Sequence, residues 1–449
     1  MVSFLEKTHF MRFLSFLENK RLTLVLASIL IVLHVGAFSY RTVVGANETA
    51  DSAEYLLCAQ NAANGQGFNT NIEGEPFSEE TVSKRPFGYP AIILAMGQSK
   101  IALMGLQTLF SLGTICLCLF FVRRFTGSNA SINFLLAGFI FTPSQVIYAT
   151  SIMSEIPFQF FLTAGILSAI LFFKENRIRW ILLSALAFSI GFTIKPVLYP
   201  AAILFSIVAL LFVTRKRLFR IIPIAILPAL CVLSMACWNY SRTQVFEISS
   251  IQTTNMLAVN MKLVLYQADG QERGEFVIDS LEREADKITN YKERQQFRSR
   301  HSRQIFLEHP IIATYQFAKG IILFFLDPGR FDCITYAGIE NRHGFMNALA
   351  AQDSGIIKRI LQSMPLWLWL VLICVLLFNV IKITFYTKFL IQDKENLPTR
   401  ILLSCGIACI ALASGPLGFS RYALPVVPLI LIGGSLAFAC KKPSNSSLK

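Results

Sequence analysis

Long apolar runs are the feature of this sequence that most limits how the chain can fold. The first covers residues 22–40, and nine more of similar character follow along the 449 residues. About 20 consecutive apolar residues let an α-helix cross the hydrocarbon layer of a bilayer. The runs are continuous, which excludes the alternating pattern of a membrane β-barrel. We therefore expect an all-α polytopic membrane protein.

The composition agrees with this class. Hydrophobic residues make up 54% of the chain and charged residues 15%, whereas soluble domains carry roughly 25% charged residues. Most of the ten cysteines lie in apolar runs, and none forms a CxxC motif or a metal-ligand spacing. We therefore expect no cofactor. A divalent metal is compatible with the chemistry considered below, but no residue spacing indicates one.

The net charge of +14 would be typical of a nucleic-acid-binding protein, but the placement of the charges is not. Basic residues gather in short segments between apolar runs: Arg123-Arg124, Lys174 to Arg179, Arg215-Lys216-Arg217 and Lys441-Lys442. Such clusters are typical of cytoplasmic loops under the positive-inside rule. The sequence therefore predicts membrane lipids as partners and no nucleic acid.

The charge pattern also predicts the topology. The segment 41–84 holds two basic and seven acidic residues, which favours the outer side. If 86–98 or 311–326 crossed the membrane, basic clusters would fall outside, so we expect both to be interfacial or re-entrant helices. About ten spans and two cytoplasmic termini result. The predicted spans are 22–40, 101–121, 131–150, 156–173, 179–194, 197–213, 218–238, 364–386, 401–414 and 422–439.

This topology gives one transmembrane domain over residues 1–440 and a short basic cytoplasmic tail at 441–449. Two larger outer segments interrupt the domain: a first loop at 41–100 and a helical cap at 239–363. The first apolar run is longer than the core of a typical signal peptide and lacks a small-residue cleavage site after it. We expect it to remain as a membrane anchor.

Several charged residues fall at the predicted outer ends of the spans. They are Asp51, Glu54, Arg85, Glu155, Lys195 and Arg421. Arginine and lysine bind phosphate by charge-assisted hydrogen bonds, and a carboxylate can take a proton from an attacking hydroxyl. Structural interpretations stay open: Glu155 suits a helix N-terminus, and Lys195 and Arg421 suit interfacial anchors. The functional interpretation is a site for a lipid-linked phosphate.

A series of short motifs resembles the GT-C superfamily of polyprenyl-phosphate-dependent glycosyltransferases. The similarity is greatest to bacterial relatives of protein O-mannosyltransferases and of the lipid A aminoarabinose transferase. The motifs are Asp51-Ser52-Ala53-Glu54-Tyr55, Arg85-Pro86-Phe87-Gly88-Tyr89-Pro90, Ser154-Glu155, Trp238-Asn239-Tyr240, His309-Pro310 and Arg421-Tyr422-Ala423-Leu424-Pro425. Two departures stand out: Phe87 replaces a proline, and Ser52 replaces the second of two adjacent acids.

The resemblance implies a GT-C-like helical bundle in the bacterial inner membrane. It also implies transfer of a monosaccharide, with inversion, from a polyprenyl-phosphate donor to a hydroxyl of a cell-surface glycan, lipid or protein. Asp51 would be the general base and Arg85 would bind the lipid phosphate. The further substrate-binding candidates are Glu54, Tyr89, Glu155, Lys195 and Arg421.

Two other functions remain as alternatives. A transporter or flippase of a lipid-linked sugar would place functional charges deep within the spans, whereas most charges here lie at the ends. An envelope glycan polymerase, ligase or assembly factor is the second alternative. Lipid binding without turnover would favour an assembly factor over an enzyme.

Overall fold

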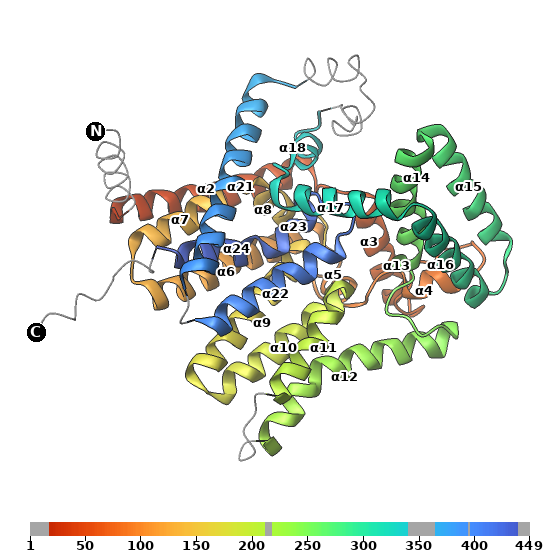
Figure 1. Cartoon of the computed structure of the whole chain (residues 1–449), viewed down its shortest axis with the longest axis horizontal. Helices are drawn as coiled ribbons and strands as arrows, with labels where there is room; N and C mark the ends of the chain where they lie inside the picture. The colour runs from red at the N-terminus through yellow and green to blue at the C-terminus, as the bar shows by residue number, and fades with distance from the viewer. Residues whose placement is uncertain (1–17, 212–217, 340–363, 394–395, 439–449) are drawn as a thin grey trace, which may run out of the picture.

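The chain is all-helical, as the apolar runs predict (Figure 1). The computed structural model describes residues 18–211, 218–339, 364–393 and 396–438. The first half contains α2 (Lys20–Val44), α3 (Ala50–Ala63), α4 (Glu79–Ser83), α5 (Gly88–Ala95), α6 (Lys100–Thr126), α7 (Asn129–Ile140), α8 (Pro143–Ala149), α9 (Glu155–Glu175), α10 (Ile178–Ile194), η1 (Pro196–Leu198) and α11 (Tyr199–Leu211).

The second half begins with the long helix α12 (Leu218–Thr243). It continues with α13 (Ile251–Asn255), η3 (Met256–Met261), α14 (Lys262–Asp269), α15 (Gln271–Lys287), α16 (Tyr291–Glu308), α17 (Pro310–Leu326), α18 (Arg330–Tyr336), α21 (Leu366–Gln392), α22 (Leu397–Ala413), α23 (Ser420–Ala423), η4 (Leu424–Val426) and α24 (Val427–Leu436). The basic cluster at Arg215-Lys216-Arg217 and the tail 441–449 lie outside the described residues.

The membrane-spanning character predicted for the chain is confirmed. Five helices (α2, α6, α9, α12 and α21) are long and apolar enough to cross a bilayer, and the number rises to seven if each of two bent pairs counts as one span. Four more predicted spans coincide with shorter apolar helices, Ile178–Ile194, Pro196–Leu210, Leu397–Ala413 and Ser420–Leu436, and the tenth, 131–150, coincides with the bent pair of α7 and α8. A total of ten spans, the single-domain division and the orientation of the termini stay predictions.

The two segments assigned to the interface differ in form. The segment 86–98 contains only α5, whose eight residues extend about 12 Å at 1.5 Å per residue, too short to cross a bilayer. The segment 311–326 belongs to α17, which follows α16 at a bend of 100°. Pro310 opens α17, because proline fits the first turn of a helix but not its interior.

Helix α9 forms the centre of the bundle. In the most apolar 18-residue stretch of α9, 78% of the residues are buried. The matching value for α2, whose side chains mostly face outward, is 11%. Close approach of neighbouring helices depends on small residues. The Ser184 hydroxyl of α10 donates to the Gly165 carbonyl of α9 at 2.7 Å. A side chain at Gly138 would lie 2.2 Å from Leu431 of α24.

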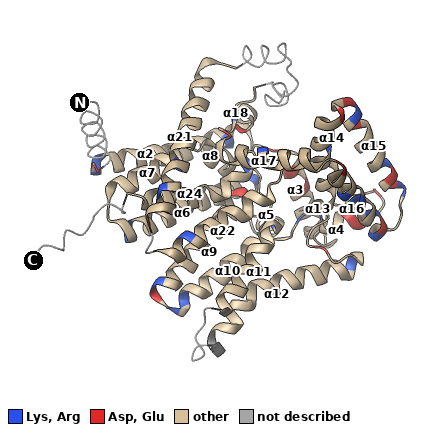
Figure 2. Ribbon diagram, in the orientation of Figure 1, with Lys and Arg blue, Asp and Glu red and all other residues tan. Residues whose placement is uncertain are grey.

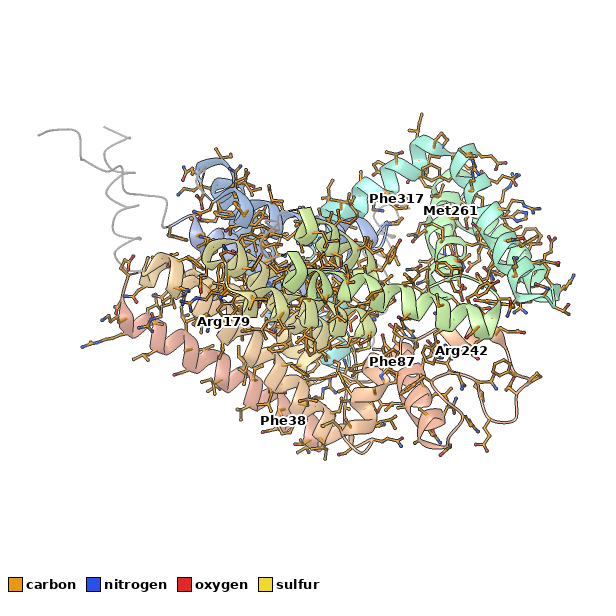
Figure 3. The ribbon with its side chains drawn as sticks, turned by 90° about the horizontal axis from the view of Figure 1, so that it is seen from below. Phe38, Phe87, Arg179, Arg242, Met261 and Phe317 are labelled. Carbon is orange, nitrogen blue, oxygen red and sulfur yellow. The ribbon has the colours of Figure 1, made fainter. Side chains whose placement is uncertain are left out.

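The cap at the start of the second half is a separate layer of helices beside the bundle (Figure 1). Its apolar cluster contains Leu257, Met261 and Ile278, with Phe317 of α17 packed against them; Met261 and Phe317 are labelled in Figure 3. Charged residues gather on α14–α16, while the bundle between the helix ends is almost free of them (Figure 2). This distribution separates a polar cap from an apolar bundle.

Charged residues at the two ends of α6 mark two levels of the molecule. Lys100, at its start, pairs with Glu48 of the first loop at 2.5 Å. Arg124, at its end, pairs with Glu175 of α9 at 2.7 Å. The 27 residues of α6 separate these levels by about 40 Å, enough to place them on opposite sides of a bilayer. The candidate site lies at the Lys100 level, because Glu155 begins α9 and Glu175 ends it.

Candidate active site

Helix α3 presents two carboxylates on one face. Thr49 and Ser52 form a capping box that fixes the start of the helix, which satisfies backbone N–H groups that would otherwise lack partners. Asp51 lies in the first turn and Glu54 three residues later. Residues three apart in a helix are neighbours on its surface, so the local sequence alone brings these acids together.

Arg85 bridges the two carboxylates. Its Nη2 donates to Asp51 Oδ1 at 2.5 Å and its Nε to Glu54 Oε2 at 2.6 Å. The guanidinium also lies over the Tyr55 ring, 4.9 Å from the centroid. The side chain of Arg85 is only 10% exposed, and Lys84 adds a further ion pair to Glu54 at 2.8 Å.

The segment that carries Arg85 is held by residues that follow α12. The Ser249 hydroxyl donates to the Lys84 carbonyl at 3.1 Å. The Ser83 hydroxyl donates to Glu247 Oε1 at 2.6 Å. Burial raises the pKa of Glu247, although its hydrogen bonds from Ser83 and Tyr291 oppose that rise. The first loop and the cap therefore jointly position Arg85.

Arg421 joins Asp51 to the bundle. Its Nη2 contacts Asp51 Oδ2, and its Nε donates to Glu155 Oε1 at 2.7 Å. Lys195 Nζ donates to the same oxygen of Glu155 at 2.9 Å. Glu155 is fully buried, and among the residues that the structure describes its other oxygen, Oε2, has no hydrogen-bond partner. That oxygen remains able to accept a hydrogen bond.

The site is thus a continuous row of alternating charges. Four cations and three carboxylates follow one another in the order Lys84, Glu54, Arg85, Asp51, Arg421, Glu155 and Lys195. They come from the first loop at 41–100, the start of α9, the α10–η1 connection and α23. The excess of one positive charge favours an anionic ligand.

The electrostatics of Asp51 follow from its two arginine partners. Burial alone would raise the pKa of Asp51, but the charges of Arg421 and Arg85 and their hydrogen bonds outweigh burial and hold it well below its ordinary value. Opposite charges within about 4–6 Å favour the ionised form of a carboxyl group. Asp51 is therefore ionised at neutral pH but is a weak proton acceptor while both arginines bind it.

Tyr89 lies behind the row of charges. It is fully buried, its hydroxyl donates to Gln107 Oε1 at 2.6 Å, and its ring meets Tyr55 edge-on at 4.8 Å. The Tyr55 ring in turn lies under the Arg85 guanidinium, and the Tyr55 hydroxyl forms a hydrogen bond with the Ser154 hydroxyl at 3.0 Å. In this arrangement Tyr89 positions Tyr55, and its predicted contact with substrate stays a prediction.

An aromatic group flanks the site on the α12 side. The Phe87 ring meets Trp238 edge-on at 6.0 Å, and the Arg242 guanidinium lies 3.8 Å from the Trp238 ring centroid. Phe87 and Arg242 appear close together in Figure 3. Asn239 donates to two carbonyls of the following loop, those of Glu247 and Ile248. The Trp238-Asn239-Tyr240 motif therefore has a clear structural role in turning the chain.

The structure brings six sequence-predicted residues into one network: Asp51, Glu54, Arg85, Glu155, Lys195 and Arg421. Their roles toward a substrate stay predictions. Sequence reasoning missed Asp327 and Asp332, which contact the residue before Arg421. An aspartate directly after the apolar segment 311–326 was the one available signal for Asp327.

Within the described parts of the chain, no three His, Cys, Asp or Glu side chains are grouped so as to hold a metal ion.

Comparisons with known proteins return little. No family model matches the chain, and no curated protein matches it. Among solved structures, the chain is similar to ArnT from Cupriavidus metallidurans bound to undecaprenyl phosphate, with 12% identity and a TM-score of 0.37 over 92% of this chain and 77% of that one. This likeness is low.

Proposed function

We propose that this protein transfers a monosaccharide from a polyprenyl-phosphate donor to an acceptor hydroxyl at the outer face of the membrane. The observation that carries the proposal is the position of Asp51 between Arg85 and Arg421, at the ends of membrane-spanning helices. A phosphate on a lipid tail reaches this depth, and two guanidinium groups are suited to bind its oxygens.

The proposed reaction needs one base and one anion site. The acceptor oxygen attacks the anomeric carbon of the sugar, and the bond from that carbon to the phosphate oxygen breaks. The lipid phosphate leaves with the bonding electrons, and the acceptor proton passes to Asp51. Arg85 and Arg421 stabilise the negative charge that develops on the leaving phosphate. Attack opposite the leaving group inverts the anomeric centre, as the motif resemblance implies.

Donor binding would activate the base. Each oxygen of Asp51 is held by one arginine, and a bound phosphate would compete for the same guanidinium N–H groups. Loss of either arginine contact raises the pKa of Asp51 toward the range in which a carboxylate accepts protons efficiently. Asp51 would therefore become an efficient general base only after the donor phosphate is in place.

An apolar cavity in the bundle suits the donor tail. It lies between α9, α10, α11 and α22 and is lined by side chains that include Phe173, Phe188, Leu204, Phe205, Cys405 and Cys409. Its α11 lining begins at Ala201, six residues after Lys195, and its α9 lining lies in the half of that helix that ends at Glu175. An isoprenoid chain would bury apolar surface there while its phosphate meets the arginines.

One observation favours a transporter instead. Lys382 is a charged residue within α21 and is only 5% exposed. Ionisable groups inside the membrane mark ion or substrate pathways in many transporters. The alternating charges at the helix ends support the transferase more directly, because they combine an anion site with a base.

The test is sugar transfer by purified protein. Polyprenyl-phosphate donors with radiolabelled sugars would be incubated with membrane-derived glycan, lipid and protein acceptors, and Asp51→Asn would serve as the matched control. Label in an acceptor with the wild type, and a large loss with the variant, is the expected result. Movement of the intact donor across vesicles without transfer would favour a flippase, and donor binding with neither activity would favour an assembly factor.

A further inference from the structure

Arg421 lies in the first turn of a helical segment, where the helix itself holds the backbone least. It is the second residue of α23, which continues through η4 into α24 as one apolar segment, Ser420–Leu436. The preceding loop contains Gly415, Pro416 and Gly418, and a side chain at Gly418 would lie 1.6 Å from the Gly320 carbonyl of α17. The first N–H groups of a helix have no partners within it, so contacts outside the segment help to set the orientation of Arg421.

Two acids hold the residue before Arg421. The Ser420 backbone N–H donates to Asp327 Oδ2 at 2.8 Å. The Ser420 hydroxyl donates to Asp332 Oδ2 at 2.7 Å. On the far side, Gln159 of α9 donates to the Leu424 carbonyl at 2.7 Å. The segment 420–424 is therefore clamped at both ends.

Asp332 is the centre of the clamp. Besides Ser420, its carboxylate accepts the Ser144 hydroxyl at 2.8 Å and the Tyr148 hydroxyl at 2.8 Å. The carboxylate thus joins α8, α18 and α23. A Cβ at Gly329 would lie 3.2 Å from Ser144 Oγ and 3.3 Å from Ser420 Oγ, so the cluster is tightly packed.

Asp332 is a buried carboxyl group that lacks a cationic partner among the described residues. The residue is 6% exposed, and in the described ranges it forms no ion pair with a cation. Burial raises the pKa of this carboxyl group, although its three hydroxyl partners oppose the rise. A buried carboxyl without a cation is destabilising, and its three hydrogen bonds, one of them from the residue before Arg421, offset that cost.

We propose that Asp332, with Asp327, is a positioning residue for Arg421 and acts through Ser420. The two acids set the direction in which the guanidinium leaves α23, and so its reach to Asp51, Glu155 and the donor phosphate. This inference rests on the proposed function for the ligand that Arg421 meets. The anchoring itself depends only on the contacts of Ser420.

The chain offers a closely matched pair of variants. Ser420→Ala and Ser144→Ala each remove one hydroxyl from the same oxygen of Asp332, but only Ser420 adjoins Arg421. Affinity for polyprenyl phosphate would be measured in purified protein. Ser420→Ala should weaken binding by about threefold to tenfold, the scale of one hydrogen bond. Ser144→Ala should leave binding unchanged, and Ser420→Thr, which keeps the hydroxyl, should restore it.

A double variant separates positioning from a general structural effect. If Ser420 acts through Arg421, Ser420→Ala should add nothing in an Arg421→Ala background. Equal losses in Ser420→Ala and Ser144→Ala, or additive losses in the double variant, would overturn the proposal.

A second measurement does not need the ligand. The amides of Tyr422 and Ala423 both donate to the Phe419 carbonyl, and their hydrogen exchange reports how firmly α23 is held. Faster exchange in Ser420→Ala than in Ser144→Ala is expected. If the wild type binds no polyprenyl phosphate, the proposed function fails, and unchanged exchange in Ser420→Ala would then refute the anchoring separately.

Discussion

Arg421 and Asp51 are 370 residues apart in the chain, yet Nη2 of the arginine contacts Oδ2 of the aspartate. The same guanidinium binds Glu155 of α9 through Nε at 2.7 Å. One side chain from α23 therefore connects the first loop to α9, the most buried of the five long apolar helices. Any substrate that takes hydrogen bonds from Arg421 must change both contacts, which couples ligand binding to the state of Asp51.

Asp51→Asn should reduce sugar transfer by about 10²-fold or more, the scale of an acid–base group. The amide keeps the size of the side chain but cannot accept the acceptor proton. Steady-state transfer at saturating donor would measure the effect. Glu54→Gln is the control, because it removes a second carboxylate bound to Arg85 and should reduce turnover less. Near-normal turnover in Asp51→Asn would refute the proposed mechanism.

Arg85→Lys should weaken donor binding by about tenfold. A lysine cannot contact two oxygens with the fixed fork of a guanidinium, and the bridge between Asp51 and Glu54 would be lost. Equilibrium binding of polyprenyl phosphate would measure this. Lys84→Arg is the control, since the Lys84 ammonium pairs with Glu54 alone among the described residues, at the exposed end of the row. Unchanged affinity in Arg85→Lys would remove Arg85 from the phosphate site.

The stability of the protein should depend on Asp51 in acid. Because Arg421 and Arg85 outweigh burial and hold the pKa of Asp51 below its ordinary value, its ion pairs stabilise the folded state above about pH 4 and that contribution is lost as pH falls further. Thermal unfolding in detergent would be compared for the wild type and Asp51→Asn. The difference in melting temperature should be constant from about pH 5 to 8 and shrink below about pH 4. A difference that grows in acid would contradict this assignment.

Lys382→Met should stabilise the fold by about 1–3 kcal/mol, the penalty for burying a polar group without a partner. Within the described residues the Lys382 ammonium has no ion pair or hydrogen bond, and it lines a small cavity with Asp327 and Asn379. Chemical denaturation would measure the change, with the partly exposed Lys388→Met as control. Lost stability would mean that the ammonium has a bound partner in the native protein. If the wild type moves a lipid-linked sugar across vesicles and Lys382→Met does not, the transporter alternative is favoured.

Donor binding should protect Cys405 and Cys409 from a thiol reagent. Both line the apolar cavity between α9, α10, α11 and α22. Variants that retain one cysteine each would be labelled with and without polyprenyl phosphate. A protein that retains only Cys374, which is exposed on α21, is the control and should label equally in both conditions. Equal labelling of Cys405 and Cys409 with and without the lipid would place the tail elsewhere.

The sequence alone determined the features that depend on neighbouring residues. Apolar runs fixed the all-helical membrane class, because hydropathy over about 20 residues decides whether a helix is stable in lipid. The three-residue spacing of Asp51 and Glu54 placed both acids on one helical face. The placement of charged residues predicted that the two ends of α6 lie on opposite sides of the membrane and that the candidate site residues share one side.

Tertiary structure decided which charges pair. Nothing near Arg421 in the sequence indicates that it binds Asp51 and Glu155 rather than solvent, because the contact arises only when α3, α9 and α23 pack together. The same is true of Asp332, an ordinary acid in the sequence that becomes a buried hub for Ser420. Hydropathy and helical periodicity act within a single helix of about 20 residues, whereas the partner of a buried charge is set by packing between segments hundreds of residues apart.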